Sequence, residues 1–179
     1  MRVITGMARG RKLREPANMD IRPTTDQVKE ALFNIVQFDI EGRRVLDLFA
    51  GTGQLGIEAL SRGARSATFV DESSEAIKII KANLEHCRLT GEVVRTDAIG
   101  FLKRCGKYDL IILDPPYASD LLEKTLKYII EFDILAEGGI IICETGAEKT
   151  VPQLDAPYYT GREYKYGKVH LTVCGRNPD

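Results

Sequence analysis

Four consecutive residues have the types and spacing to hold an amine for chemistry: Asp114, Pro115, Pro116 and Tyr117. They follow the apolar run 110–113, which predicts a buried strand, and an open α/β sheet binds its ligands at the carboxyl ends of its strands. The carboxylate and the prolyl carbonyls accept hydrogen bonds, the prolines bring no N–H donor, and the tyrosine offers a flat ring. This combination indicates a pocket for the exocyclic amine of a planar base. A rigid turn after the strand is the structural alternative.

A glycine-rich segment offers a second place for chemistry. Residues 51–56 read G-x-G-x-x-G after an apolar run and at the start of a helical pattern, and Asp71 follows Gly51 by 20 residues. The pattern meets the dinucleotide-binding fingerprint, in which the later acid accepts hydrogen bonds from ribose hydroxyls. A nicotinamide-dependent oxidoreductase is therefore one interpretation.

Two further acids favour a different ligand. Asp47 lies just before the glycines, where its carboxylate would repel a pyrophosphate but attract a ligand with an ammonium and a sulfonium, such as S-adenosylmethionine. Thr96, Asp97 and Ala98 follow another apolar run and offer polar groups that can bind an adenine amine. A structural acceptor role stays open for Asp47, and a helix N-cap role stays open for Asp97.

The elements that must position these residues alternate along the chain. Apolar runs predict five strands, at 45–49, 67–71, 92–96, 109–113 and 140–144. Helical spacing of apolar residues predicts the segments 55–61, 74–86, 98–104 and 121–131. Strands joined by helices of this length imply right-handed crossovers and a mainly parallel sheet that is covered on both faces. Two more strand candidates, 158–166 and 168–174, meet at Gly167, so we expect a doubly wound α/β fold of seven strands with a C-terminal antiparallel hairpin.

The first 22 residues predict a basic arm or hairpin ahead of one domain, 23–179. They contain two acidic residues, Glu15 and Asp20, and six basic ones: Arg2, Arg9, Arg11, Lys12, Arg14 and Arg22. The arm thus carries +4, and the remaining 19 basic and 24 acidic residues give the body −5. A basic arm on an acidic body favours contact with phosphates, although a solvated terminus would show the same charges. After the arm, Thr24 or Thr25 is expected to cap a helix.

Composition excludes several classes of protein. The 179 residues suit one soluble domain, and no stretch approaches the roughly 20 apolar residues of a membrane span. A signal-peptide pattern is absent, so the expected location is cytoplasmic. The four cysteines are far apart and only two histidines accompany them, so we predict buried thiols and no metal site.

The residues also resemble a known family. Segments 45–53 and 114–117 resemble motifs I and IV of class I S-adenosylmethionine-dependent methyltransferases, which have a Rossmann-like fold. Three further segments, 2–13, 22–34 and 56–64, are similar to the bacterial RsmD family, which methylates N2 of one guanine in 16S ribosomal RNA. The similarity extends over nearly the whole chain.

The resemblance implies a role for each matching residue. The methionine part of the cofactor would be held by Asp47, Phe49, Ala50, Gly51, Thr52 and Gly53. Asp71, where members often have Glu, or the adjacent Glu72 would bind the ribose, and Asp97 with Ala98 would bind the adenine. The RNA would be contacted by Arg9, Arg11, Lys12, Arg22 and Thr24.

The expected reaction moves a methyl group to the N2 amine of a guanine of 16S rRNA, in an assembling or complete 30S subunit. Asp114 and the Pro115 carbonyl would accept the two amine N–H groups, and Tyr117 would stack on the base, which is worth roughly 1–3 kcal/mol. The base must leave its stack to reach such a pocket. The alternatives are an N6-adenine DNA methyltransferase, a protein glutamine N5-methyltransferase, a NAD-dependent oxidoreductase and a non-catalytic RNA-binding module.

Overall fold

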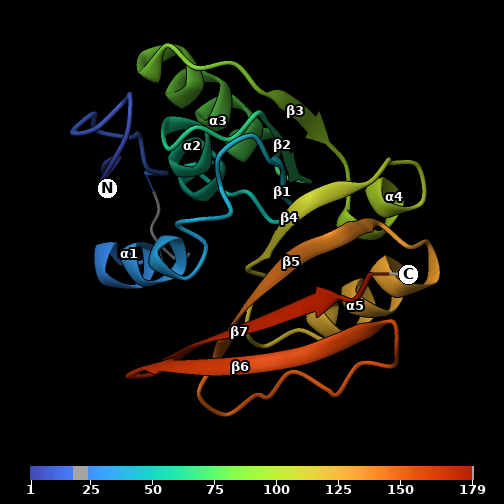
Figure 1. Cartoon of the computed structure of the whole chain (residues 1–179). Helices are drawn as coiled ribbons and strands as arrows, with labels where there is room; N and C mark the ends of the chain where they lie inside the picture. Colours follow the sequence, from blue (N-terminus) through green and yellow to red (C-terminus); the bar gives the residue numbers. More distant parts are fainter. Residues whose placement is uncertain (18–23, 179) are drawn as a thin grey trace.

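The computed structural model describes residues 1–17 and 24–178. This part of the chain forms five helices and one seven-stranded sheet (Figure 1). The strands are β1 Arg44–Asp47, β2 Ser66–Asp71, β3 Glu92–Arg95, β4 Tyr108–Leu113, β5 Leu135–Gly146, β6 Tyr158–Tyr166 and β7 Val169–Arg176. The helices are α1 Asp26–Ile35, α2 Gln54–Ser61, α3 Ser74–Cys87, α4 Ala98–Leu102 and α5 Leu121–Glu131.

The strand order is β3-β2-β1-β4-β5-β7-β6, in which the first five strands are parallel and β7 is antiparallel to both of its neighbours. From β1 the chain builds outward to β2 and β3, then returns to add β4 and β5 on the other side. The order therefore reverses between β1 and β4, which is where ligands of open α/β sheets bind. The predicted doubly wound fold with a C-terminal antiparallel hairpin is confirmed.

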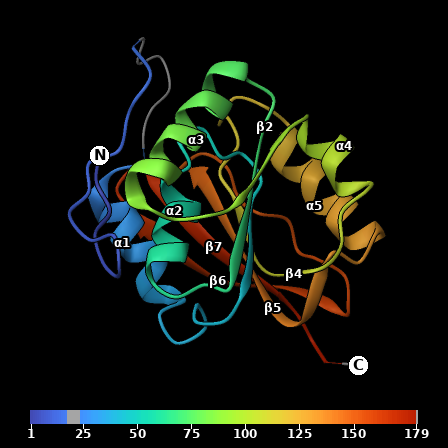
Figure 2. The ribbon, with the colours of Figure 1, turned by 90° about the horizontal axis from the view of Figure 1, so that it is seen from above.

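Apolar residues on both faces of the strands explain the layers. In β4, Leu110 and Ile112 belong to the core beneath α1, α2 and α3, whereas Ile111 and Leu113 belong to the core beneath α4 and α5. Figure 2 shows these two groups of helices on opposite sides of the sheet. Burial of successive residues on alternate faces is the reason why the strands read as continuous apolar runs.

Two local expectations need correction, and a third is decided between its alternatives. The first strand ends at Asp47 instead of residue 49, and the Leu48 N–H still reaches the Ile112 carbonyl at 3.3 Å. The strand expected at 140–144 already begins at Leu135, because Leu135 pairs with Tyr108 of β4. Gly138, with φ +71°, lies in the irregularity of pairing that follows. Of the two threonines expected as the cap of α1, Thr25 has this role, and its hydroxyl accepts from the Val28 N–H at 3.3 Å.

Residues at the start of the chain form a hairpin that is fastened to α2. Arg2 pairs with Lys12, and the Val3 N–H donates to the Arg11 carbonyl at 2.9 Å. The buried Glu58 carboxylate accepts from the N–H groups of Ile4 and Thr5 at 2.9 and 3.0 Å, because the turn of α2 that carries it faces the hairpin. The division into an arm, 1–22, and a domain, 23–179, stays a prediction, since part of that boundary lies outside the described residues.

The four cysteines are free, and Cys105 is the most accessible of them while the other three are buried. Among the residues that the structure describes, His, Cys, Asp and Glu side chains form no group of three or more that could hold a metal ion. The helices of the same ranges include none long and apolar enough to cross a membrane.

Candidate active site

A cavity of about 640 Å³ lies at the carboxyl ends of β1, β2, β3 and β4. Its wall brings together residues from Leu48 to Leu121, because four strands that are neighbours in the sheet end there. Ten of the predicted site residues line it: Phe49, Gly51, Asp71, Glu72, Asp97, Ala98, Asp114, Pro115, Pro116 and Tyr117. The predicted cofactor and amine sites therefore share one cavity.

The glycine loop is held between β1, β2 and α3. Gly53, with φ +80°, occupies the N-cap position of α2, a left-handed conformation that glycine adopts without strain. The Ala50 N–H donates to the Val70 carbonyl at 2.9 Å, and the buried Asn83 amide donates to the Thr52 carbonyl at 2.9 Å. The cavity lining does not include Ala50, Thr52 or Gly53. Their backbone contacts hold the loop in place on the side away from the cavity.

Asp47 is buried behind the same loop. Its Oδ2 accepts from the Gly56 N–H in the first turn of α2 at 3.0 Å, and its side chain does not line the cavity. Burial raises the pKa of Asp47 to about 7, with a smaller contribution from the Asp71 charge, while the bond from Gly56 opposes the shift. The structure thus gives Asp47 the geometry of an internal acceptor, and its contact with the cofactor stays a prediction.

Both candidates for the ribose lie on the cavity wall. The Asp71 oxygens accept from the N–H groups of Gly51 and Ser73, each at 2.9 Å. Glu72 is exposed. Asp97 also lines the cavity while it caps α4 through the Gly100 N–H at 2.8 Å, so the two roles weighed for it are compatible.

Asp114 belongs to a small polar cluster that joins β4, β5 and the segment before α1. The Thr24 hydroxyl lies 3.2 Å from Asp114 Oδ2 and 3.4 Å from Glu144 Oε2, and the Tyr117 hydroxyl donates to Glu144 Oε1 at 2.6 Å. Burial, and then the nearby Glu144 charge, raise the pKa of Asp114 well above its ordinary value, while the bond from Thr24 opposes the shift. A carboxylate whose pKa is raised is a stronger base than an exposed one.

Glu144 is the site residue that sequence reasoning missed. It lies near the end of β5, with its side chain buried beside Asp114, and Gly146 follows it under the Tyr117 ring. The available signal was the one used for Asp47 and Asp71: an acid that ends an apolar strand at the ligand-binding edge. The hydrogen bond from the Tyr117 hydroxyl to Glu144 orients the Tyr117 ring relative to Asp114.

The predicted RNA-binding residues fall into three groups. Arg9 and Lys12 are exposed on the hairpin, and Arg11 donates to the His86 carbonyl at 2.8 Å. Thr24 joins the Asp114 cluster, and Arg22 lies outside the described residues. The structure does not bring the hairpin residues to the cavity wall.

Residues 1–175 match the family model described as "Conserved hypothetical protein 95". The chain belongs to this family. It is 36% identical over 178 residues to "Ribosomal RNA small subunit methyltransferase D" of Escherichia coli (strain K12), with 98% of this chain and 90% of that protein covered. It is 42% identical over 179 residues to "Putative rRNA methyltransferase YlbH" of Bacillus subtilis (strain 168), with 97% of each covered. The resemblance to the RsmD family is confirmed.

Solved structures agree with the fold. "Putative methyltransferase yhhF from Escherichia coli" superimposes with a TM-score of 0.90 at 34% identity, covering 100% of this chain and 99% of that one. A structure from Thermus thermophilus, of "hypothetical protein TTHA0928", gives a TM-score of 0.84 at 27% identity and covers 97% and 98% of the two chains. These two solved structures thus share the fold of this chain over nearly their whole length.

Proposed function

We propose that this protein transfers a methyl group from S-adenosylmethionine to the N2 amine of a guanine in 16S rRNA, in an assembling or complete 30S subunit in the cytoplasm. The observation that carries the proposal is the shared cavity, in which Asp114–Tyr117 face the loop that follows β1. Relatives that match nearly the whole chain are named as methyltransferases of ribosomal RNA, which supports the same class of substrate.

The described wall of the cavity fits a cationic cofactor. Four of its side chains are acidic, Asp71, Glu72, Asp97 and Asp114, and the described lining includes no lysine or arginine. When bound, the cofactor supplies an electrophilic methyl group on a positively charged sulfonium. Asp71 or Glu72 would hold the ribose, and Asp97 with Ala98 would hold the adenine.

The chain itself holds and orients the amine. The Asp114 carboxylate and the Pro115 carbonyl accept the two N–H groups, which directs the nitrogen lone pair toward the methyl group. Positioning of this kind is a large part of catalysis between two bound reactants. The Tyr117 ring, supported by Gly146 and tied to Glu144, provides the surface on which the base stacks. After transfer the amine is cationic, and Asp114, whose pKa is raised, takes its proton.

The basic hairpin would bind the RNA outside the cavity. Arg9 and Lys12 are exposed there, and their contacts with phosphates should weaken steeply as salt is added.

Methylation of small ribosomal subunits and of free 16S rRNA with a labelled methyl donor tests the proposal. The expected product is N2-methylguanosine, found by nucleoside analysis of the RNA. Label in N6-methyladenine or in protein, with none in N2-methylguanosine, would contradict the assignment and favour one of the other amine methyltransferases.

A further inference from the structure

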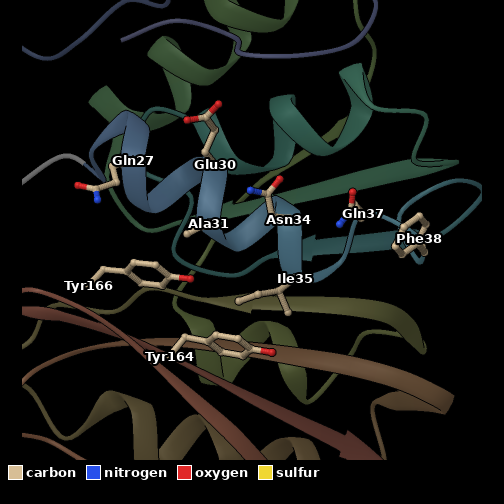
Figure 3. A pocket seen from close by; sticks show the side chains of 9 residues that line it. All are labelled: Gln27, Glu30, Ala31, Asn34, Ile35, Gln37, Phe38, Tyr164 and Tyr166. Carbon is tan, nitrogen blue, oxygen red and sulfur yellow. The ribbon is translucent and has the colours of Figure 1, made fainter.

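A second hollow, of about 540 Å³, lies between α1 and β6. One wall is a stripe of α1 and the segment after it, and the other wall is made by Tyr164 and Tyr166, which project from the same face of β6 (Figure 3). We call it the α1–β6 groove. None of the residues assigned to the cofactor or to the amine lines it.

The α1–β6 groove leads away from the candidate active site. Gln27 and Tyr166 lie at one end and Phe38 lies at the other (Figure 3). Gln27 follows by three residues Thr24, whose hydroxyl contacts Asp114. On the other wall, Tyr166 pairs with Val169, which also pairs with Gly146 of β5.

The side chains of the groove suit flat, hydrogen-bonding groups. Tyr164, Tyr166 and Phe38 offer ring faces, and Phe38 is 92% exposed. The amides of Gln27, Asn34 and Gln37 offer both donors and acceptors, which match the edges of nucleobases.

The charge around β6 suits a polyanion. Residues 158–168 carry three basic side chains, Arg162, Lys165 and Lys168, and one acidic one, Glu163, which lies 3.7 Å from Lys165 and leaves +2. Glu30 on the other wall of the groove reduces this local charge to +1. The three basic side chains are exposed, and the Arg162 guanidinium lies 4.7 Å from the centre of the Tyr164 ring. Proteins that bind single strands combine aromatic faces for the bases with cations for the backbone.

We propose that the α1–β6 groove binds unpaired nucleotides of the RNA that adjoin the target base. The inference rests on the proposed function, since a base extruded into the cavity leaves its neighbours unstacked and in need of new partners. Tyr166 and Tyr164 stack on these neighbours in turn, and Phe38 closes the far end. The groove therefore selects RNA by its single-stranded character.

Binding of a fluorescent single-stranded RNA oligonucleotide to the full chain tests the inference, with the same sequence annealed to its complement for comparison. Tyr166→Ala and Phe38→Ala should each weaken binding of the single strand about tenfold, the scale of one lost base–aromatic stack. Tyr166→Phe should retain the wild-type affinity. The matched control is Tyr159→Ala, on the same strand, 42% exposed and outside the groove, which should leave affinity unchanged.

The same variants are then assayed for methylation of small ribosomal subunits, where the groove variants should raise KM about tenfold and retain kcat. Phe38 is exposed, so its variant keeps the fold, and unchanged cofactor affinity verifies this for all variants. The inference is overturned if both alanine variants bind single-stranded RNA as the wild type does. It is also overturned if the two alanine variants bind single-stranded RNA normally and are impaired only in methylating small ribosomal subunits. That result would mean that the groove binds a ribosomal protein. RNA binding needs no turnover. The titration therefore tests whether the groove binds single-stranded RNA even if the wild-type protein methylates no RNA and the proposed function fails.

Discussion

Asp114 directly follows β4 and Glu144 lies on the neighbouring strand β5, and the hydroxyl of Thr24 lies within hydrogen-bonding distance of both. Their roles differ because their partners differ. Asp114 lines the cavity, where it can meet an amine, whereas Glu144 accepts the Tyr117 hydroxyl at 2.6 Å. One carboxyl group is thus placed for the substrate, and the other for the ring that orients it.

Replacing Asp114 with alanine tests its role. Asp114→Ala removes an acceptor of the amine and the group that takes its proton, so kcat should fall about 100-fold or more. Cofactor affinity, measured by calorimetry, should remain within a few fold of the wild type. Undiminished turnover by this variant would falsify the assignment.

The Tyr117–Glu144 hydrogen bond calls for a double-mutant cycle. Tyr117→Phe keeps the stacking ring, so it should lower kcat about tenfold with little change in KM for RNA. Because Tyr117→Phe and Glu144→Ala remove the same bond, the double variant should lose less than the product of the two single losses. Glu137→Ala, an exposed position near the start of the same strand, is the control. Strictly multiplicative losses would mean that the bond does not orient the ring.

Asp47 should make stability depend on pH. Its pKa is raised from 3.8 to about 7 in the folded chain, so folding favours its protonated form. This stabilisation is fully present below about pH 4 and is lost as the pH rises to about 7. Asp47→Asn keeps an oxygen for the Gly56 N–H but cannot ionise.

Urea unfolding of the cofactor-free protein measures the effect. Between about pH 4 and about pH 7, the free energy of unfolding of Asp47→Asn should fall less than that of the wild type. The difference should reach up to about 4 kcal/mol, since one pKa unit corresponds to about 1.4 kcal/mol. Asp155→Asn, at a carboxyl in the loop before β6, is the control. Parallel pH profiles of wild type and Asp47→Asn would show that Asp47 ionises as freely as in the unfolded chain.

At the scale of elements, the hairpin and α2 behave as one unit. Glu58 accepts two hairpin N–H groups, and the Met7 N–H donates to the Ser61 carbonyl at 2.9 Å. Asn83 of α3 joins the following segment to the glycine loop, since its amide contacts both the Arg14 backbone and the Thr52 carbonyl. The basic hairpin and the glycine loop are therefore held by the same pair of helices, α2 and α3.

Two glycines of the hairpin test this support. Both have positive φ, +91° at Gly6 and +83° at Gly10, so an alanine at either position costs about 1–2 kcal/mol in backbone strain. At Gly6 the added Cβ would also lie 1.8 Å from the Ser61 carbonyl oxygen, whereas nothing lies within 4 Å at Gly10. Gly6→Ala should thus lower the free energy of unfolding more than Gly10→Ala does, and expose the hairpin to proteolysis. Equal losses in the two variants would show that the hairpin is not fastened to α2.

Strands were predictable where burial on both faces left an apolar run, as in 109–113. The position of β7 between β5 and β6 was not predictable, because a tight turn at Gly167 specifies a hairpin but not which of its strands joins the sheet. The candidate site shows the same division. Asp114–Tyr117 form a contiguous pattern, but the Glu144 contact joins residues 27 positions apart and depends on the register of β4 and β5.

At the scale of the whole molecule, ligand binding should stabilise the fold. Parallel strands that meet at one cavity, together with the glycine loop, make a site that the unfolded chain lacks. S-adenosylmethionine at 100 times its Kd should add about 2.7 kcal/mol, or roughly 5–10 °C in Tm for a chain of this size. NADH at the same concentration should leave Tm unchanged in a thermal melt. Stabilisation by NADH alone would favour the oxidoreductase.

The acidic wall of the cavity has a consequence for how RNA can approach. A nucleobase is neutral, whereas each phosphate of its backbone is an anion that the described carboxyl groups of the wall would repel. An RNA bound as proposed would therefore place its base in the cavity and keep its backbone at the rim, so charge as well as shape would limit how far the strand enters.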